Sequence, residues 1–203
     1  MTAIIDYGLG NLGSIYNMLD AIGEDSVITD NKNKIHDCNR IILPGVGSFD
    51  AGMKNLEEKE LVSILNDEVN SGKSVLGICL GMQLLGRKSE EGKRSGLNFI
   101  PFDTVKFSFA ENIKLRIPHM GWDIVSFTQE NKLLNNINGT QRYYFVHSYH
   151  AKCDSEKNIL MKCDYGYEFA ASVVNENVYG VQFHPEKSHD FGMRLLKNFV
   201  ENC

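Results

Sequence analysis

The sequence predicts a single α/β domain over residues 1–203, built in three layers around a sheet that is parallel in its first half and antiparallel in its second. Up to Glu91, short apolar runs alternate with segments of helical periodicity, which is typical of βαβ units with helices on both faces of a parallel sheet. After Glu91, short β-rich runs follow one another with turn residues between them, which favours antiparallel pairing.

Each expected element has a local reason. In the first half, apolar runs predict strands at 3–5, 27–28, 41–43 and 74–78. Apolar residues at helical spacing predict helices at 12–22, 61–69 and 80–85, and Gly23 and Gly72 stand where glycine commonly ends a helix. In the second half, we expect strands at 105–107, 123–125, 143–146, 170–174 and 178–181, and a final helix with the apolar stripe Phe191, Leu195 and Phe199.

Composition and charge exclude several classes of protein. The chain has 21 Lys and Arg against 26 Asp and Glu, a net charge of -5, so it offers no basic surplus to nucleic acid or to an anionic membrane. No apolar run approaches the roughly 20 residues of a spanning helix, and the amino terminus does not resemble a signal peptide. Five scattered cysteines without a CxxC pair indicate reduced thiols, so we expect a cytoplasmic protein.

The glycines Gly8, Gly10 and Gly13 form a G-x-G-x-x-G motif directly after the first expected strand. One interpretation is a dinucleotide site, with a pyrophosphate on the backbone amides and Asp30 on the ribose. The other is a tight turn from strand to helix that needs glycine for conformational reasons alone. We favour the turn, because a lone motif of this kind is weak evidence, and keep the dinucleotide-binding module as an alternative from a different class.

A second glycine-framed segment predicts a nucleophile. Cys79 lies in Gly77-Ile78-Cys79-Leu80-Gly81, the cysteine form of the G-x-S-x-G turn between a strand and a helix. Such a turn raises the side chain at the carboxyl edge of the sheet, where the start of the next helix favours a thiolate. The amide of Leu80 is expected to point at the developing oxyanion. The other four cysteines lack glycine neighbours of this kind.

A cysteine nucleophile requires a base, and His184 is the strongest of six candidates. It follows an expected strand and precedes Pro185, and Glu186 is close enough in sequence to accept the Nδ1 proton. That contact would fix the tautomer so that Nε2 faces the thiol. His119 is a weaker alternative, because its surroundings, residues 118–122, are more typical of a binding loop.

His147, His150 and Cys153 have a spacing that raises the possibility of zinc. Residues three apart on one strand face opposite sides of a sheet, so the two imidazoles are not expected to converge. We therefore predict neither a metal nor another cofactor.

The loop at 44–47, Pro44-Gly45-Val46-Gly47, follows an expected strand next to the nucleophile strand. Loops after neighbouring parallel strands open on the same edge of a sheet, so its backbone amides can supply a second oxyanion donor. Glycine permits the peptide rotation that would aim such a donor.

Together these segments resemble the class I, triad-type glutamine amidotransferase family, whose members have a flavodoxin-like fold. The resemblance rests on GICLGMQLL at 77–85, PGVGSF at 44–49 and GVQFHPEKS at 180–188. DYGLGNLGS at 6–14, IPHMGWD at 117–123 and YYFVHSYHA at 143–151 make it more similar to the glutaminase subunits of imidazole glycerol phosphate synthase. The resemblance covers essentially the whole chain.

The resemblance implies roles for individual residues. It implies a triad of Cys79, His184 and Glu186. It implies that the oxyanion is held by Gly45, Val46, Gly47 and Leu80, and the substrate L-glutamine by Gly47, Gln83, Glu91, His147 and Ser148. It implies that the face toward a partner subunit includes Asn11, Pro118, His119, Met120 and Trp122.

The same resemblance implies a partner, a (β/α)8 barrel cyclase that receives ammonia and forms imidazole glycerol phosphate in histidine biosynthesis. Two departures from the family pattern lie near the expected partner face: Asp123 stands where asparagine is usual, and residues 48–52 differ from the commoner run. They leave open a second possibility, a paralogous glutaminase that supplies ammonia to a sugar amidine-forming synthase.

Overall fold

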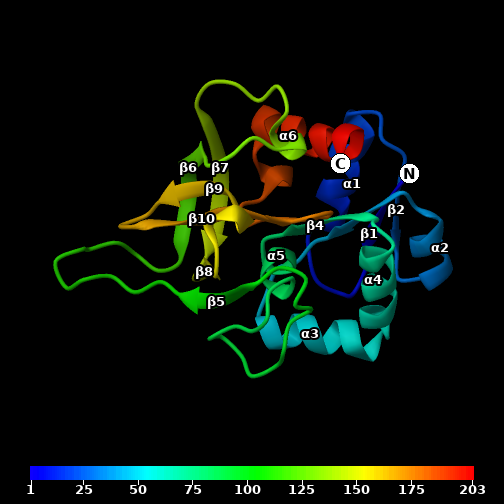
Figure 1. The fold of residues 1–203 in the computed structure, drawn as a ribbon, viewed down its shortest axis with the longest axis horizontal. Helices are drawn as coiled ribbons and strands as arrows, with labels where there is room; N and C mark the ends of the chain where they lie inside the picture. The colour runs from blue at the N-terminus through cyan, green and yellow to red at the C-terminus, as the bar shows by residue number, and fades with distance from the viewer.

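The computed structural model describes residues 1–203 and contains one eleven-stranded mixed sheet (Figure 1). Along the sheet the strands follow the order β2-β1-β3-β4-β11-β10-β9-β6-β7, while β5 pairs with β8 and β8 with β10. The strands are β1 (Thr2–Ile5), β2 (Ser26–Thr29), β3 (Arg40–Leu43), β4 (Ser74–Ile78), β5 (Phe102–Lys106), β6 (His119–Phe127), β7 (Gln141–His147), β8 (Tyr149–Cys153), β9 (Ile159–Asp164), β10 (Glu168–Asn175) and β11 (Val178–Val181).

Helices cover both faces of the parallel part of the sheet, as the sequence predicts (Figure 1). They are α1 (Leu12–Ala21), α2 (Lys32–Asp37), α3 (Phe49–Glu58), α4 (Leu61–Asn70), α5 (Leu80–Leu84) and α6 (His189–Asn202), with short 3-10 turns at Lys132–Leu134, Glu156–Asn158 and Pro185–Lys187. Helices α1 and α6 lie on one side of the sheet, and α3 and α4 lie on the other. Helices α2 and α3 have no counterpart among the predicted elements. None of these helices is long and apolar enough to cross a membrane.

Alternation along the central strands divides the apolar core in two. On β1, Ile4 packs in the cluster beneath α1 and α6, whereas Ala3 and Ile5 pack in the cluster that contains residues of α2, α3 and α4. Successive side chains of a strand point to opposite faces, so a fully apolar strand can serve two helical layers at once. This explains why the first strands read as unbroken apolar runs.

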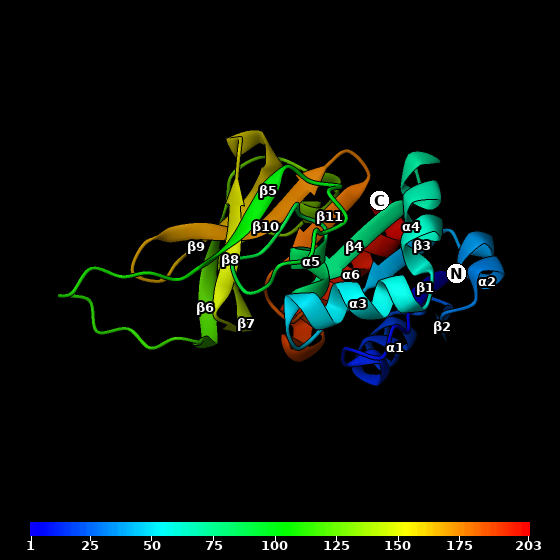
Figure 2. The same cartoon turned by 90° about the horizontal axis from the view of Figure 1, so that it is seen from below.

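The second half is antiparallel, as expected, but the sequence patterns miss two of its strands. Only Ser148 separates β8 from β7, and β8 contains the polar residues His150 and Lys152, so it does not stand out as a separate apolar run. β9 follows a short 3-10 turn and pairs with both β10 and β6. The segment between β5 and β6 projects away from the rest of the molecule in both views (Figures 1 and 2).

The strand register brings three distant loops to one edge of the sheet. Leu43 at the end of β3 pairs with Gly77 of β4, and Val181 at the end of β11 pairs with Ile78. All three strands are parallel, so the segments that follow them, 44–47, 79–81 and 182–184, emerge side by side. These segments carry the residues that the sequence singles out.

The G-x-G-x-x-G segment forms a turn whose geometry explains its first two glycines. Gly8 and Gly10 have φ values of +84° and +115°, a region that favours glycine. A Cβ on Gly10 would lie 3.0 Å from the side chain of Pro44. Asp30, the residue proposed for a ribose, is instead paired with Lys59 at 2.8 Å.

Candidate active site

Cys79 has the strained backbone of a nucleophile turn. It lies between β4 and α5 with φ +54° and ψ −110°, a conformation that non-glycine residues rarely adopt. Its amide donates to the carbonyl of Val181 at 2.8 Å, which ties the turn to the end of β11. The side chain is almost fully buried but lines a cavity. The predicted turn between a strand and a helix is present, and the catalytic role of Cys79 stays a prediction.

The glycines around Cys79 are required by close backbone contacts. A Cβ on Gly81 would lie only 1.8 Å from the carbonyl oxygen of Leu43. A Cβ on Gly77 would lie 2.7 Å from the backbone of Met82. Helix α5 therefore packs so tightly against β3 and β4 that only glycine fits at these two positions.

His184 and Glu186 form a buried pair at the same edge. Nδ1 of His184 lies 2.8 Å from Oε1 of Glu186, and each side chain is 1% exposed. The 3-10 turn at Pro185–Lys187 bends the chain so that the carboxylate turns back toward the ring. Ser188 supports the turn, because its hydroxyl donates to the carbonyl of His184 at 2.6 Å.

The charge on His184 is set by its two neighbours. Burial by itself would lower its pKa, but the Cys79 and Glu186 side chains outweigh that effect and raise the pKa to about 10. Nε2 of His184 is buried and makes no hydrogen bond of good geometry, although Cys79 is close enough to affect its titration. The imidazole is therefore suited to hold a proton beside the sulfur.

A cavity of about 330 Å³ opens above the sulfur. Every residue that the sequence assigns to glutamine contributes to its wall. Its lining consists of Val46, Gly47, Cys79, Leu80, Gln83, Glu91, Pro118, Val146, His147, Ser148, Tyr149 and His184.

Two polar side chains in this wall are anchored by backbone groups. Glu91 accepts a hydrogen bond from the amide of Phe49 at 2.8 Å, at the start of α3. Gln83 donates to the carbonyl of Tyr149 at 3.2 Å and lies 3.1 Å from Oε1 of Gln182. Their positions in the cavity are therefore fixed by the fold rather than by a bound molecule.

The expected oxyanion donors are not all free. The amide of Leu80 donates to the carbonyl of Gly45 at 3.3 Å, so that donor is occupied within the protein. Tyr7 pins the same loop, because its hydroxyl donates to the carbonyl of Pro44 at 2.6 Å. Gly47 has a φ of +114°. The prediction that Leu80 points toward an oxyanion therefore needs correction for this conformation.

The expected partner face divides between exposed and buried residues. Met120 and Trp122 are 61% and 40% exposed, and Asn11 is partly exposed, with a side chain that makes no capping hydrogen bond. Pro118 lines the cavity. His119, however, is only 1% exposed, so its prediction as a surface contact is wrong: alternation along β6 turns it inward.

Two further histidines, His147 and His150, lie in an aromatic cluster around Phe107. His147 and His150 both approach Phe107, with ring centroids 5.2 and 4.7 Å apart, because Ser148 breaks the strand between them. The sequence argument that they face opposite sides is therefore wrong, since it assumed one continuous strand. Burial lowers the pKa of His147 to about 3 and also lowers the pKa of His150.

His119 contacts His147 and Asp123. The atoms of His119, Asp123 and Cys163 that could bind a metal ion lie within 4.8 Å of one another. The hydrogen bond of 2.7 Å between His119 and Asp123 accounts for their closeness, so the group is not evidence of an ion. Burial lowers the pKa of His119, although Asp123 acts in the opposite direction.

The sequence patterns overlook Gln182 as a neighbour of the nucleophile. Its Nε2 lies 3.8 Å from Sγ of Cys79, and its side chain is buried. The available signal was its place between an expected strand and His184, which puts it at the same sheet edge. Tyr149 was overlooked in the same way, since its contribution to the site is a backbone carbonyl.

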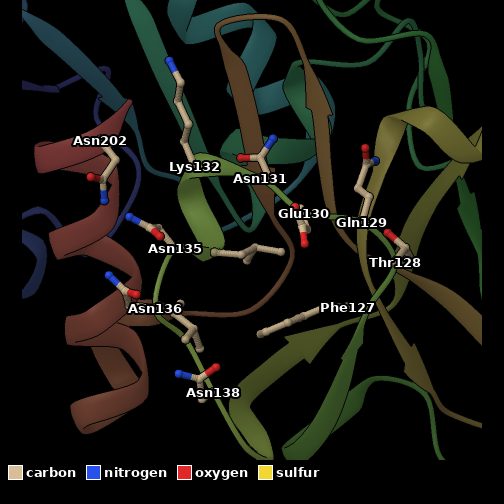
Figure 3. A pocket seen from close by; sticks show the side chains of 12 residues that line it. Phe127, Thr128, Gln129, Glu130, Asn131, Lys132, Asn135, Asn136, Asn138 and Asn202 are labelled. Atoms are coloured by element: carbon tan, nitrogen blue, oxygen red, sulfur yellow. The ribbon is translucent and has the colours of Figure 1, made fainter.

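A larger cavity of about 930 Å³ lies elsewhere, between the segment at 127–138 and the end of α6 (Figure 3). Several of its side chains are amides, among them Asn135, Asn136 and Asn202. It contains none of the residues discussed above. The candidate site is therefore the smaller cavity at the ends of β3, β4 and β11.

Comparisons with known proteins agree with this geometry. The model of the glutamine amidotransferase class-I family matches residues 3–203. The chain is 54% identical to imidazole glycerol phosphate synthase subunit HisH 2 of Methanococcus maripaludis, covering 100% of both chains. It is 48% identical to the protein of the same name from Pseudomonas aeruginosa, covering 99% of both.

A crystal structure of a glutamine amidotransferase superposes with a TM-score of 0.78 at 17% identity, covering 98% of this chain and 97% of the other. At that identity the superposition supports the fold alone, whereas the sequence matches span the whole chain. The chain belongs to the class-I glutamine amidotransferase family and, within it, to the HisH subunits of imidazole glycerol phosphate synthase.

Proposed function

We propose that the protein hydrolyses L-glutamine to glutamate and ammonia and passes the ammonia to a cyclase subunit, which forms imidazole glycerol phosphate in histidine biosynthesis. The observation that carries the proposal is a strained Cys79 sharing one cavity with a buried His184–Glu186 pair. The family membership of the whole chain supports the same reaction. Five free cysteines fit a cytoplasmic protein.

In this reaction the sulfur of Cys79 attacks the side-chain carboxamide of glutamine. His184 holds a proton beside the sulfur and gives it to the departing ammonia, which leaves a γ-glutamyl thioester on Cys79. Glu186 keeps the imidazole in the orientation that both steps require. Water, deprotonated by His184, then attacks the thioester and releases glutamate.

The oxyanion step requires a change in the loop at 44–47. In the present conformation the carbonyl of Gly45 accepts the amide hydrogen of Leu80, which the tetrahedral intermediate would need. Rotation of the Gly45–Val46 peptide would free that amide. One missing oxyanion donor typically costs about 100- to 1,000-fold in kcat. We therefore expect slow hydrolysis by the chain alone and faster hydrolysis when a partner favours the rotated loop.

The partner is proposed to be a (β/α)8 barrel cyclase that docks on the exposed face of β6. Met120, Trp122 and Ile124 alternate outward on this strand, and aromatic and methionine side chains are enriched at protein interfaces. The same strand carries His119 on its inner face. A partner on the outer face of β6 would therefore lie next to His119, whose neighbour His147 lines the glutamine cavity.

The test is glutamate release by the chain alone and with its co-purified synthase subunit and nucleotide ligand. Cys79→Ala should abolish glutamine hydrolysis while cyclisation with free ammonium salt continues at the normal rate. Cys153→Ala, which removes a thiol outside the cavity, serves as the matched control. Loss of both activities in Cys79→Ala, or normal hydrolysis in that variant, would contradict the proposal.

A second candidate is a paralogous glutaminase that serves a sugar amidine-forming synthase. Two observations favour keeping it: the two relatives described above both carry the numeral 2 in their names, and Asp123 departs from the family pattern. Isolation of the native complex separates the two candidates. A barrel cyclase supports histidine biosynthesis, whereas a sugar-modifying synthase supports the second candidate.

A further inference from the structure

A chain of polar contacts runs from the half-exposed side chain of Asp123 on strand β6 to the glutamine cavity. Oδ2 of Asp123 lies 2.7 Å from Nε2 of His119, and Nδ1 of His119 lies 3.1 Å from Nε2 of His147. Nδ1 of His147 lies 2.7 Å from the carbonyl oxygen of Tyr149. We call Asp123, His119 and His147 the histidine relay. The carbonyl at its inner end also accepts a hydrogen bond from Gln83.

The strand geometry explains why these three side chains meet. His119 and His147 are direct partners in the antiparallel pairing of β6 with β7. His119 and Asp123 lie on the same face of β6, and Gly121 between them has no side chain to separate them. Cross-strand pairing and one glycine therefore assemble the relay.

With both imidazoles neutral, the relay has one hydrogen fewer than its contacts need. It contains three contacts, and its outer and inner ends, a carboxylate and a backbone carbonyl, both accept hydrogen bonds. Each neutral imidazole supplies one N–H, so His119 and His147 together supply two hydrogens for three contacts. All three contacts become hydrogen bonds only when the relay binds a third proton; with two hydrogens, one of the three contacts lacks one whichever tautomers the rings adopt.

Burial lowers the pKa of His119 and so confines the extra proton to acidic solution, whereas Asp123 and the neighbouring aromatic rings favour it. The ring of His119 stacks between Phe145 and Tyr165, with centroids 4.7 and 4.0 Å away, and a cation is attracted to aromatic faces. The titratable groups that face the relay are Asp123 on β6, His147 on β7, His150 on β8, Cys163 on β9 and Tyr165 after β9, with His184 beyond His147. Among these, only Asp123 offers a carboxylate to balance the charge.

We propose that the histidine relay is a positioning device that holds one extra proton and thereby fixes the Tyr149 carbonyl and Gln83 at the glutamine cavity. The inference rests on the proposed glutaminase function. The extra proton completes the third hydrogen bond, and its loss at higher pH leaves one contact without a hydrogen. Glutamine binding should then weaken, while the chemistry at Cys79 is unaffected.

Asparagine at position 123 gives a discriminating variant. Its amide group can donate a hydrogen to Nε2 of His119 without any charge, so Asp123→Asn completes the relay at every pH. Asp123→Ala removes the outer partner altogether. Asp164→Asn, at an exposed carboxylate that no histidine contacts, is the matched control.

The experiment measures KM and kcat for glutamine from acidic to slightly alkaline pH, because the lowered pKa of His119 places the loss of the proton on the acidic side, using each variant in complex with the synthase subunit. In the unmodified protein and in Asp164→Asn, KM should rise about 2- to 10-fold with pH, as expected for one lost hydrogen bond. In Asp123→Asn, KM should stay flat, and in Asp123→Ala it should be raised throughout. Parallel KM profiles for the unmodified protein and Asp123→Asn would overturn the proposal.

Nitrogen NMR of labelled histidines gives a readout that does not depend on activity. The ring of His119 should show one pH-dependent change in the unmodified protein and none in Asp123→Asn. A His119 ring signal that responds to added zinc, and not to pH, would overturn the proposal, since a metal ion and not a proton would then lie between His119 and Asp123. If no variant hydrolyses glutamine but the NMR change is present, the proposed function fails while the relay stands.

Discussion

The parallel and antiparallel halves of the sheet contribute to the site in different ways. In the parallel half, the working parts are loops at the ends of β3, β4 and β11, and each follows its strand directly in sequence. In the antiparallel half, the working parts are side chains from β6 and β7 that meet across the sheet. The parallel half therefore builds the site from local turns, whereas the antiparallel half builds it from strand register.

The largest expected effect tests the triad at the parallel edge. His184→Asn removes the group that moves the proton and should lower kcat for glutamine hydrolysis by about 10,000- to 1,000,000-fold, the range for other triads. Steady-state glutamate release by the complex measures it. Ammonium-dependent cyclisation in the same complex serves as the control for folding and docking. A fall of less than tenfold would show that another base operates.

A glycine substitution tests how tightly the parallel half is built. Gly81→Ala places a Cβ 1.8 Å from the carbonyl of Leu43, so α5 or β3 must move. We expect a loss of about 3 kcal/mol or more in the free energy of unfolding, measured by urea denaturation. Gly13→Ala, whose Cβ meets nothing within 4 Å, should be nearly neutral by the same measurement. Equal losses of stability at both positions would show that close backbone packing is not the reason for glycine at position 81.

Acid should weaken the antiparallel half first. The pKa of His147 falls from 6.5 to about 3 on folding, so the unfolded chain binds a proton at this residue that the folded chain does not. Stability contributed by the neutral ring is present above pH 6.5 and is lost as the pH falls toward 3. At about pH 5 the loss from His147 is about 2 kcal/mol. Hydrogen exchange across pH should show β7 and β8 opening before β1 and β4.

The smallest effect concerns the loop at 44–47. Tyr7→Phe removes the buried hydrogen bond to the carbonyl of Pro44 and leaves that oxygen without a partner. We expect a loss of about 1 to 2 kcal/mol in the free energy of unfolding. Tyr16→Phe, at an exposed ring, is the matched control for thermal denaturation. A more mobile loop should also narrow the difference in glutaminase rate between the free chain and the complex.

The catalytic half of the site was predictable because its signals are local. Positions 77 and 81 carry glycine because any side chain there would strike the backbone of a neighbouring segment, and that requirement is visible in five consecutive letters. The proline after His184 and the acid at 186 are equally close to the base they serve. For the same reason, the strands β1 to β4 were readable as short apolar runs.

The regions that the sequence misled on are those where register decides. The family resemblance of residues 117–123 placed His119 on the partner face with Met120 and Trp122, yet alternation on β6 turns it inward. β8 was missed because it contains His150 and Lys152 and because only Ser148 separates it from β7, so no turn signal marks where it begins. Nothing in the local sequence states that position 119 pairs with position 147.

The amino-acid sequence alone determines the chemistry of the site. It shows a cysteine on a turn between glycines, a histidine with its carboxylate, and an alternation of strands and helices that places them at one edge of the sheet. The state of that chemistry depends on packing: the carbonyl of Gly45 occupies the Leu80 amide, and His119 meets His147 across β6 and β7. The two kinds of property differ in how far apart in sequence the residues that determine them lie. Backbone conformation and side-chain type are properties of neighbouring residues, whereas hydrogen-bond partners depend on which distant segments pack together.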